Sequence, residues 1–168
     1  YKYTFFEKTI MAIKTSELSI FEKNNMQSII SSAWEDRTLL EKSETQQAIR
    51  EVINQLDTGK LRVASPTDGG WQVNEWVKKA VVLYFPIQKM ETLEVGPMEF
   101  YDKMPLKRGY KEKGIRVVPH AIARHGAYIS SGVILMPSYV NIGAYVDAGT
   151  MVDTCLLYTS DAADEEDS

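Results

Sequence analysis

A repeat of six residues runs through positions 114–154 and limits the folds open to this chain. An apolar residue recurs at every sixth position: Tyr128, Ile134, Val140, Val146 and Val152. A small residue lies two places before each of them: Gly126, Gly132, Ser138, Ala144 and Thr150. Helices have a period near 3.6 and strands a period of two, so neither explains the pattern. A triangular solenoid of short parallel strands does, and we predict the first coils of a left-handed parallel β-helix.

The chain before this repeat has the pattern of an α+β helical cap. Apolar residues between Met26 and Trp34 fall on one helix face. A second helix is predicted to begin at Ser43 as its capping residue, with Gln46 reaching back, and to end near Gly59. A third follows Asn74 and ends before Pro86. Between them, a strand at 61–64, a turn at 66–70 and a strand at 71–73 predict a small hairpin.

These patterns divide the chain into five segments. We predict an N-terminal extension over 1–25, a helical α+β domain over 26–86, a connecting loop over 87–113, the start of the β-helix over 114–154, and a tail over 155–168. The loop has no sustained period, and is read either as a functional loop or as a solvated linker. Met11 is a plausible initiator, in which case residues 1–10 would be upstream sequence.

The tail departs from the rest of the chain in charge and in pattern. Lys and Arg number 19 against 23 Asp and Glu, but five of those acids lie within residues 161–168, so the remainder is nearly neutral. Such a balance, without a basic cluster, argues against nucleic acid as a partner. CLLYTSDAADE, from Cys155 to Glu165, resembles one translated frame of a sequencing adapter, and we expect residues after Thr154 not to be native. The absence of a long apolar run predicts a cytoplasmic protein with no membrane partner.

Four segments resemble one enzyme family, the 2,3,4,5-tetrahydropyridine-2,6-dicarboxylate N-succinyltransferases. They are DTGKLRVA from Asp57, NEWVKKAVVLYF from Asn74, GIRVVPHAIARHGAYI from Gly114 and MPSYVNIGAYVDAGTMVDT from Met136. The resemblance implies a homotrimer that transfers the succinyl group of succinyl-CoA to the amine of hydrated, ring-opened tetrahydrodipicolinate, in lysine and diaminopimelate biosynthesis. It also implies that the groove for the donor and a second catalytic carboxylate lie in later coils, so the chain alone should be inactive. We also expect the chain to be poorly soluble, because the second coil is incomplete and leaves apolar residues around Val152 without a following layer.

The resemblance also assigns two site residues. Arg116, in GIRVVP, matches the family's substrate-binding arginine, and a guanidinium suits a carboxylate because it donates two parallel hydrogen bonds. Asp153, in MVDT, matches the substrate-contacting aspartate, which would bind the amine and help remove its proton as a catalytic group. Asn141 and Asp147 share the repeat position of Asp153 and are read as solvated corners. The cations Lys107, Arg108 and Arg124 rank below Arg116 as substrate ligands.

The remaining chemistry-bearing residues suggest no other site. His120 and His125 could serve as a general base or as zinc ligands, as in other β-helix enzymes, but two histidines are too few for such a zinc site and no metal is expected. Cys155 is not assigned a nucleophilic role. Trp34, Trp71 and Trp76 are read as core or trimer-contact residues. The alternative functions are another hexapeptide-repeat O- or N-acetyltransferase and a non-catalytic β-solenoid.

Overall fold

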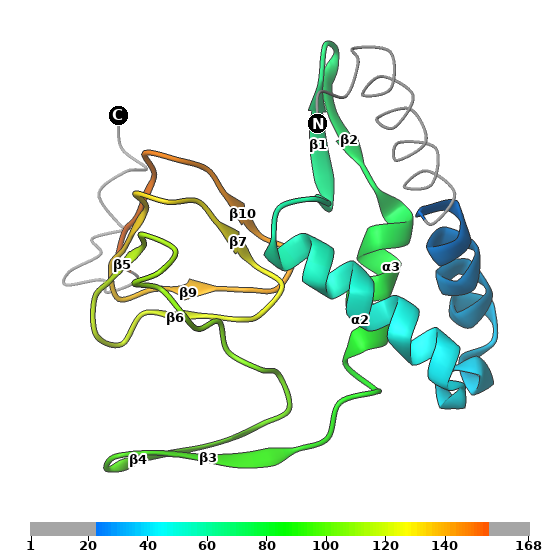
Figure 1. The fold of residues 1–168 in the computed structure, drawn as a ribbon, viewed down its shortest axis with the longest axis horizontal. Helices are drawn as coiled ribbons and strands as arrows, with labels where there is room; N and C mark the ends of the chain where they lie inside the picture. Colours follow the sequence, from blue (N-terminus) through cyan, green and yellow to red (C-terminus); the bar gives the residue numbers. More distant parts are fainter. Residues whose placement is uncertain (1–22, 155–168) are drawn as a thin grey trace, which may run out of the picture.

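A computed structural model describes residues 23–154 of the 168-residue chain. The predictions about residues 1–10 and about the tail after Thr154 lie outside this range. Helices form one part of the molecule and short parallel strands the other, with two antiparallel hairpins projecting from them (Figure 1).

The helical part has one apolar core. Its elements are a helix over residues 23–35, the 3-10 helix η1 (Arg37–Glu41), and the helices α2 (Ser43–Asp57) and α3 (Glu75–Tyr84). Ile30, Ile49, Ile53, Val77 and Leu83 are at most 1% exposed and pack together. The helix over residues 23–35, α2 and α3 each contribute the predicted apolar face, so the periodicity identified these three helices correctly. The 3-10 helix η1 was not predicted, and it has no buried residue.

The start of α2 differs from the prediction in its cap. Ser43 is the first helical residue rather than the cap, and Lys42 occupies the cap position without a side-chain hydrogen bond to the helix. The Gln46 amide instead donates to the carbonyl of Leu40 at 2.9 Å, because η1 folds back over the first turn. The helix ends as predicted, since Gly59 adopts a φ of 75° that favours glycine.

Two antiparallel hairpins flank the helices. The first pairs β1 (Ala64–Thr67) with β2 (Gly70–Val73), so its turn is tighter than the predicted 66–70. The second pairs β3 (Glu91–Val95) with β4 (Met98–Asp102) inside the segment that the sequence suggested was irregular. Gly96, with a φ of 59°, and Pro97 form its two-residue connection, and glycine at the first of these positions is typical of a type II′ turn.

The C-terminal part consists of two-residue strands, and strands three places apart in the chain order pair with each other. One sheet contains β5 (Arg116–Val117), β8 (Ile134–Leu135) and β11 (Met151–Val152). The other two sheets pair β6 (Ile122–Ala123) with β9 (Tyr139–Val140), and β7 (Tyr128–Ile129) with β10 (Tyr145–Val146). All these pairs are parallel, an arrangement compatible with a partial β-helix.

The predicted apolar column is displaced by one residue in its first two units. The buried residues there are Ile129 and Leu135 rather than Tyr128 and Ile134, whereas Val140, Val146 and Val152 pack on the core as predicted. The reason is a five-residue unit between Leu135 and Val140. Gly114, His120, Gly126, Gly132, Gly143 and Gly149 each lie three places before an inward residue and have a positive φ. Pro137 stands at the equivalent place in the short unit, and its ring forbids that conformation.

Aromatic contacts join the helical part to the sheet of β7 and β10. The rings of Tyr128 and Tyr145 lie 4.5 Å apart, and the Arg62 guanidinium lies 3.4 Å from the centre of the Tyr145 ring. Gly59 packs so closely on Tyr128 that an added Cβ would come within 2.7 Å of the ring. The end of α2 therefore lies directly against β7, as Figure 1 also shows.

Candidate functional site

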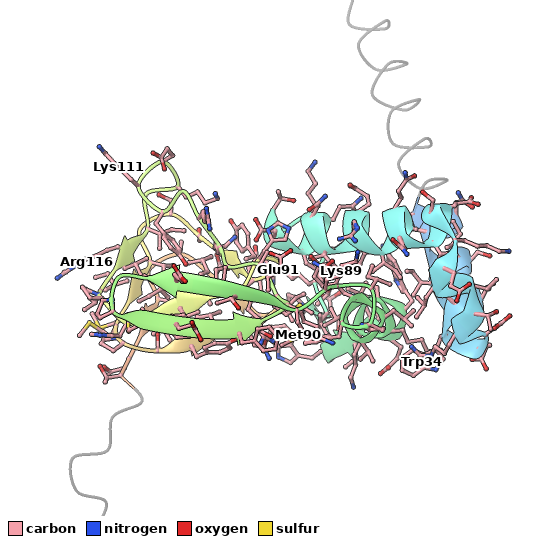
Figure 2. The ribbon with its side chains drawn as sticks, turned by 90° about the horizontal axis from the view of Figure 1, so that it is seen from below. Trp34, Lys89, Met90, Glu91, Lys111 and Arg116 are labelled. Carbon is pink, nitrogen blue, oxygen red and sulfur yellow. The ribbon has the colours of Figure 1, made fainter. Side chains whose placement is uncertain are left out.

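Arg116 lies on β5 at the end of the molecule farthest from the first helix. Its backbone N–H donates to the carbonyl of Val133 at 3.0 Å, which fixes this strand against β8. Its neighbour Val117 faces the core of the strand region, so alternation along the strand directs the Arg116 side chain outward. Figure 2 shows this side chain pointing away from the body of the molecule. The guanidinium is thus exposed to solvent and accessible to a ligand.

Asp153 directly follows β11 on the same sheet and is also exposed. Its Oδ1 accepts a hydrogen bond from the N–H of Thr154 at 2.7 Å. Asp147 and Asn141 accept equivalent bonds from the next residue, at 2.8 Å and 2.9 Å. The three side chains therefore share one local geometry, and only their places around the strands distinguish them.

The strand register brings Arg116 and Asp153 to one side of the β5, β8 and β11 sheet. Val117 pairs with Leu135 and Leu135 pairs with Val152, and all three face the core. Arg116 directly precedes the inward-facing Val117, and Asp153 directly follows the inward-facing Val152. By alternation along the chain, both side chains therefore lie on the outer side of the sheet. Two strand spacings, about 10 Å, separate their strands. Along the strand direction, Asp153 lies two residues beyond Met151, the residue in register with Ile134 and Arg116.

Of the three other cations considered as substrate ligands, Lys107 and Arg124 are held in structural contacts. Lys107 is 4% exposed and its Nζ lies 2.6 Å from Asp57 Oδ1. Arg124 pairs with Asp102 at 3.0 Å and donates to Asn141 Oδ1 at 3.3 Å. Arg108 is exposed, and its backbone carbonyl accepts from Lys113 Nζ at 2.8 Å. Lys107 and Arg124 are therefore poor candidates for binding a substrate carboxylate.

Asp57 is the centre of a junction that sequence reasoning missed. Its Oδ1 accepts from Lys107 and also from the backbone N–H of Gly126 at 2.8 Å, and it lies 3.3 Å from His125 Nδ1. Burial acts to raise the pKa of the Asp57 carboxyl. The hydrogen bonds from His125, Lys107 and Gly126, with the charge of Lys107, outweigh burial and hold this pKa well below its usual range.

The histidines occupy positions that differ in kind. His120 is exposed and has a φ of 75°, in a place where neighbouring units have glycine. The His125 ring bridges Asp57 and Asn54, with Nε2 at 3.0 Å from Asn54 Oδ1. Within residues 23–154, no three His, Cys, Asp or Glu side chains gather as a metal site requires.

The tryptophans divide between core and surface. Trp34 and Trp76 pack against the helical core, whereas Trp71 on β2 is 71% exposed. Trp34 also has the Arg37 guanidinium 4.3 Å from its ring centre. The core interpretation therefore fits two of the three, and Trp71 is a surface residue.

A cleft of about 920 Å³ lies between the helices, the β3–β4 hairpin and residues 104–108. Its wall includes the Asp57 junction on one side and Leu93, Val95 and Phe100 of the hairpin on the other. Figure 2 labels Lys89, Met90 and Glu91 where the chain leaves the helices to form the hairpin. Sequence reasoning missed the cleft because it treated the hairpin as a loop.

The helical part matches a known protein family. The family model described as Tetrahydrodipicolinate N-succinyltransferase N-terminal matches residues 25–87. The match contains α2, α3 and the β1–β2 hairpin, and it ends just before the β3–β4 hairpin.

Longer alignments extend the similarity to the succinyltransferases into the parallel strands. A 2,3,4,5-tetrahydropyridine-2,6-dicarboxylate N-succinyltransferase of Acinetobacter baylyi is 45% identical over 141 residues, which cover 78% of this chain and 52% of that protein. The enzyme of the same name from Variovorax paradoxus is 50% identical over 140 residues, covering 77% and 50%. One from Bordetella petrii is 50% identical over 129 residues, covering 71% and 47%. The chain thus spans about half the length of these curated relatives.

Between residues 23 and 154, no helix combines the length and the apolar character that crossing a membrane requires.

Proposed function

We propose that this chain is the N-terminal half of a succinyltransferase that acylates the amine of ring-opened tetrahydrodipicolinate with succinyl-CoA, in lysine and diaminopimelate biosynthesis. The similarity to enzymes of that name supports the proposal. The observation that carries it here is the placement of Arg116 and Asp153 on the outer side of one sheet. Neither an O-acetyltransferase nor a non-catalytic solenoid is favoured by a comparable observation.

The two residues divide the work on the acceptor. Arg116 binds a carboxylate of the substrate through two parallel N–H donors, which fixes the orientation as well as supplying opposite charge. Asp153 accepts a hydrogen bond from the substrate amine. An amine attacks a thioester only when its nitrogen lone pair is free, so a carboxylate that helps to remove the ammonium proton favours the reactive form.

The reaction then needs no nucleophile from the protein. The amine nitrogen attacks the thioester carbonyl of succinyl-CoA, the new C–N bond forms an amide, the C–S bond breaks, and the CoA thiol leaves with a proton. Such a direct transfer agrees with the site, in which Arg116 and Asp153 provide binding and proton transfer. The donor groove and a second carboxylate would belong to coils beyond this chain, so the chain alone is expected to be inactive.

The proposed architecture is a cytoplasmic homotrimer of left-handed β-helices. The parallel pairing of every third strand and the row of positive φ values at the corners support the solenoid. The exposed outer side of the β5, β8 and β11 sheet supports a site that becomes enclosed only when neighbouring subunits pack side by side.

The proposal is tested by replacing Arg116 with lysine in the full-length protein. Arg116→Lys keeps the charge but loses the second parallel donor, and a charge-assisted hydrogen bond contributes about 1.5–3 kcal/mol. We therefore expect kcat/KM for the diacid to fall roughly ten- to a hundred-fold. Arg37→Lys, on η1, is the matched control and should leave kcat/KM unchanged. An Arg116→Lys enzyme with wild-type kinetics would refute the clamp, and a full-length protein without succinyl transfer would refute the function.

A further inference from the structure

The cleft between α2 and the β3–β4 hairpin has a wall of polar side chains on the helix. Arg50, Asn54 and Asp57 lie at positions i, i+4 and i+7 of α2 and line the cleft, so they share one face of the helix. Asp57 is held by Lys107. Asn54 Oδ1 lies 3.0 Å from His125 Nε2, a contact that does not use the amide N–H groups of Asn54. The Asn54 amide and the Arg50 guanidinium are therefore the hydrogen-bond donors that this wall offers to a ligand.

Arg50 carries a charge that its neighbours do not neutralise. Its Nη1 donates to Gln88 Oε1 at 2.7 Å, and Gln88 Nε2 donates to the Tyr84 hydroxyl at 2.7 Å. Burial raises the pKa of Tyr84 above its ordinary value, so this hydroxyl stays neutral. Within residues 23–154, Arg50 forms no ion pair with an acid. Because a guanidinium has five N–H donors, several of them remain available to an anion in the cleft.

The remaining charges of the cleft wall are mostly positive. Two of its four acids are held in the ion pairs of Lys107 and Arg124, which leaves Glu91 and Glu94. Figure 2 shows Lys89 and Glu91 where the helical wall meets the hairpin. Besides Lys107, the cations that line the cleft are Arg50, Lys89, Lys103, Arg108 and Lys113. This excess of cations favours an anionic ligand over a cationic one.

The opposite wall of the cleft is the apolar face of the hairpin. Leu93 pairs with Phe100, and Val95 extends the same face, since residues two apart on a strand point to one side. All three line the cleft, together with Met104, which follows β4. Val95 is 52% exposed and Phe100 38%, so this wall keeps apolar surface in contact with solvent. A ligand with an apolar part would remove that surface from water.

We propose that this cleft binds a small amphiphilic carboxylate, with its head on Arg50 and its alkyl or aryl part on the apolar face of the hairpin. The cleft volume of about 920 Å³ lies at the upper end of the range of about 300–1,000 Å³ that ligand pockets span. An uncharged apolar ligand would leave the Arg50 charge without a counter-ion, and a small polar dianion would leave the apolar wall in water. The proposal goes beyond succinyl transfer and does not rest on it, because it uses no residue of the β5, β8 and β11 sheet.

Titration of the full chain with alkyl carboxylates tests the proposal, with backbone ¹H–¹⁵N NMR shifts as the readout. Hexanoate, octanoate and decanoate are added separately, below the concentrations at which they form micelles. We expect saturable shifts at residues 50–54 and 91–100, and a Kd that falls by about threefold or more for each two added CH2 groups, because each CH2 removed from water strengthens binding. Octan-1-ol, which lacks the charge, should bind about tenfold or more weakly than octanoate. A Kd independent of chain length or of charge, or no saturable shift at these residues, would overturn the proposal.

Two pairs of variants separate binding of the head from binding of the apolar part, and all four side chains are exposed, so the fold should tolerate the changes. Arg50→Gln should raise the Kd for octanoate about tenfold or more, whereas Arg37→Gln, on η1 and outside the cleft, should leave it unchanged. Phe100→Ser should raise this Kd about threefold or more, and Tyr101→Ser, on the other face of the hairpin, should not. Equal Kd values within either pair would contradict the proposed site. None of these measurements uses succinyl transfer, so failure of this site is distinguishable from failure of the proposed function.

Discussion

The Asp57 junction predicts an asymmetric pattern of destabilisation when its charges are removed. Asp57→Asn keeps the shape of the side chain and an oxygen that can accept from Gly126 N–H, but it leaves the Lys107 ammonium without its counter-ion. The Lys107 side chain is only 2% exposed, whereas that of Asp57 is 13% exposed. Breaking a buried pair by removing one partner costs about 3–5 kcal/mol of unfolding free energy, and we expect Asp57→Asn to lie in that range.

Lys107→Met, alone and combined with Asp57→Asn, tests the same ion pair from the other side. Lys107→Met leaves a carboxylate that still accepts from Gly126 and contacts His125, so it should cost less than Asp57→Asn. The double variant contains no buried charge and should recover much of the loss, because replacing a buried pair by apolar groups is often nearly neutral. The loss of unfolding free energy should be about 1–3 kcal/mol larger in Asp57→Ala than in Asp57→Asn, since alanine leaves the Gly126 N–H without an acceptor.

Urea unfolding, followed by tryptophan fluorescence and circular dichroism, measures these differences without adding salt that would screen the charges. The double-mutant cycle should give a coupling energy above about 1 kcal/mol. If Asp57→Asn costs less than about 1 kcal/mol, or if Lys107→Met does not rescue it, the junction is not the buried ion pair described here. A change in the slope with denaturant would show that the variant had altered the extent of the cooperative unit.

In the full-length enzyme, Asp153→Asn should lower kcat/KM by about a hundred-fold or more, while Asp147→Asn, which has the same local bond, should change it less than about twofold. The pKa of Asp57 is lower in the folded than in the unfolded state, so the stabilisation by its carboxylate should be fully present above the unfolded pKa of about 3.9 and should decline as the pH falls below it. Urea titrations between pH 7 and pH 2 should show this decline in the wild type and not in Asp57→Asn. Gly59→Ala should cost more unfolding free energy than Gly132→Ala, since both have a left-handed φ but only the Cβ at 59 meets a tyrosine ring, and equal costs would contradict that close contact.

The sequence specified the helices more reliably than it specified details within them, and the predicted repeat is compatible with the observed short parallel strands. Apolar residues on one face of a helix report burial directly, so the core from Ile30 to Leu83 was predictable. The predicted apolar column was displaced by one residue in its first two units because small residues occupy both the corner position and the position after it, so both fit the column of small residues. Pro137 was the available signal: a residue that cannot adopt a positive φ must shorten or reshape its corner.

The β3–β4 hairpin was missed for a different reason. Pro97 and the many charges were read as marks of an irregular loop, yet the residues around Gly96 and Pro97 alternate between apolar and polar on both sides. A Gly-Pro pair at the centre of such an alternation is compatible with a tight turn between two strands. The charges are on strands because an exposed hairpin has one face in solvent.

Contacts between residues far apart in the sequence could not be predicted from local patterns. Arg116 and Asp153 were selected by family resemblance, and their meeting on one sheet depends on a register that no local pattern reports. Asp57 is 50 positions from Lys107 and 69 from Gly126 in the sequence. No periodicity connects residues so far apart, so a junction of this kind becomes visible only when the fold places them together.

The three sheets of the strand region differ in what covers their outer sides. Helix α2 and Arg62 cover the sheet of β7 and β10. On the other two sheets, Tyr139 of β9 is 51% exposed and Met151 of β11 is 58% exposed. The sheet of β5, β8 and β11 is the one on which Met151 stays exposed beside Arg116. A ligand must approach from solvent before a lid or a neighbouring subunit encloses it. Because the Asp57 junction fixes the helices on a different side, it holds the N-terminal part away from this sheet and leaves Arg116, Met151 and Asp153 exposed to solvent.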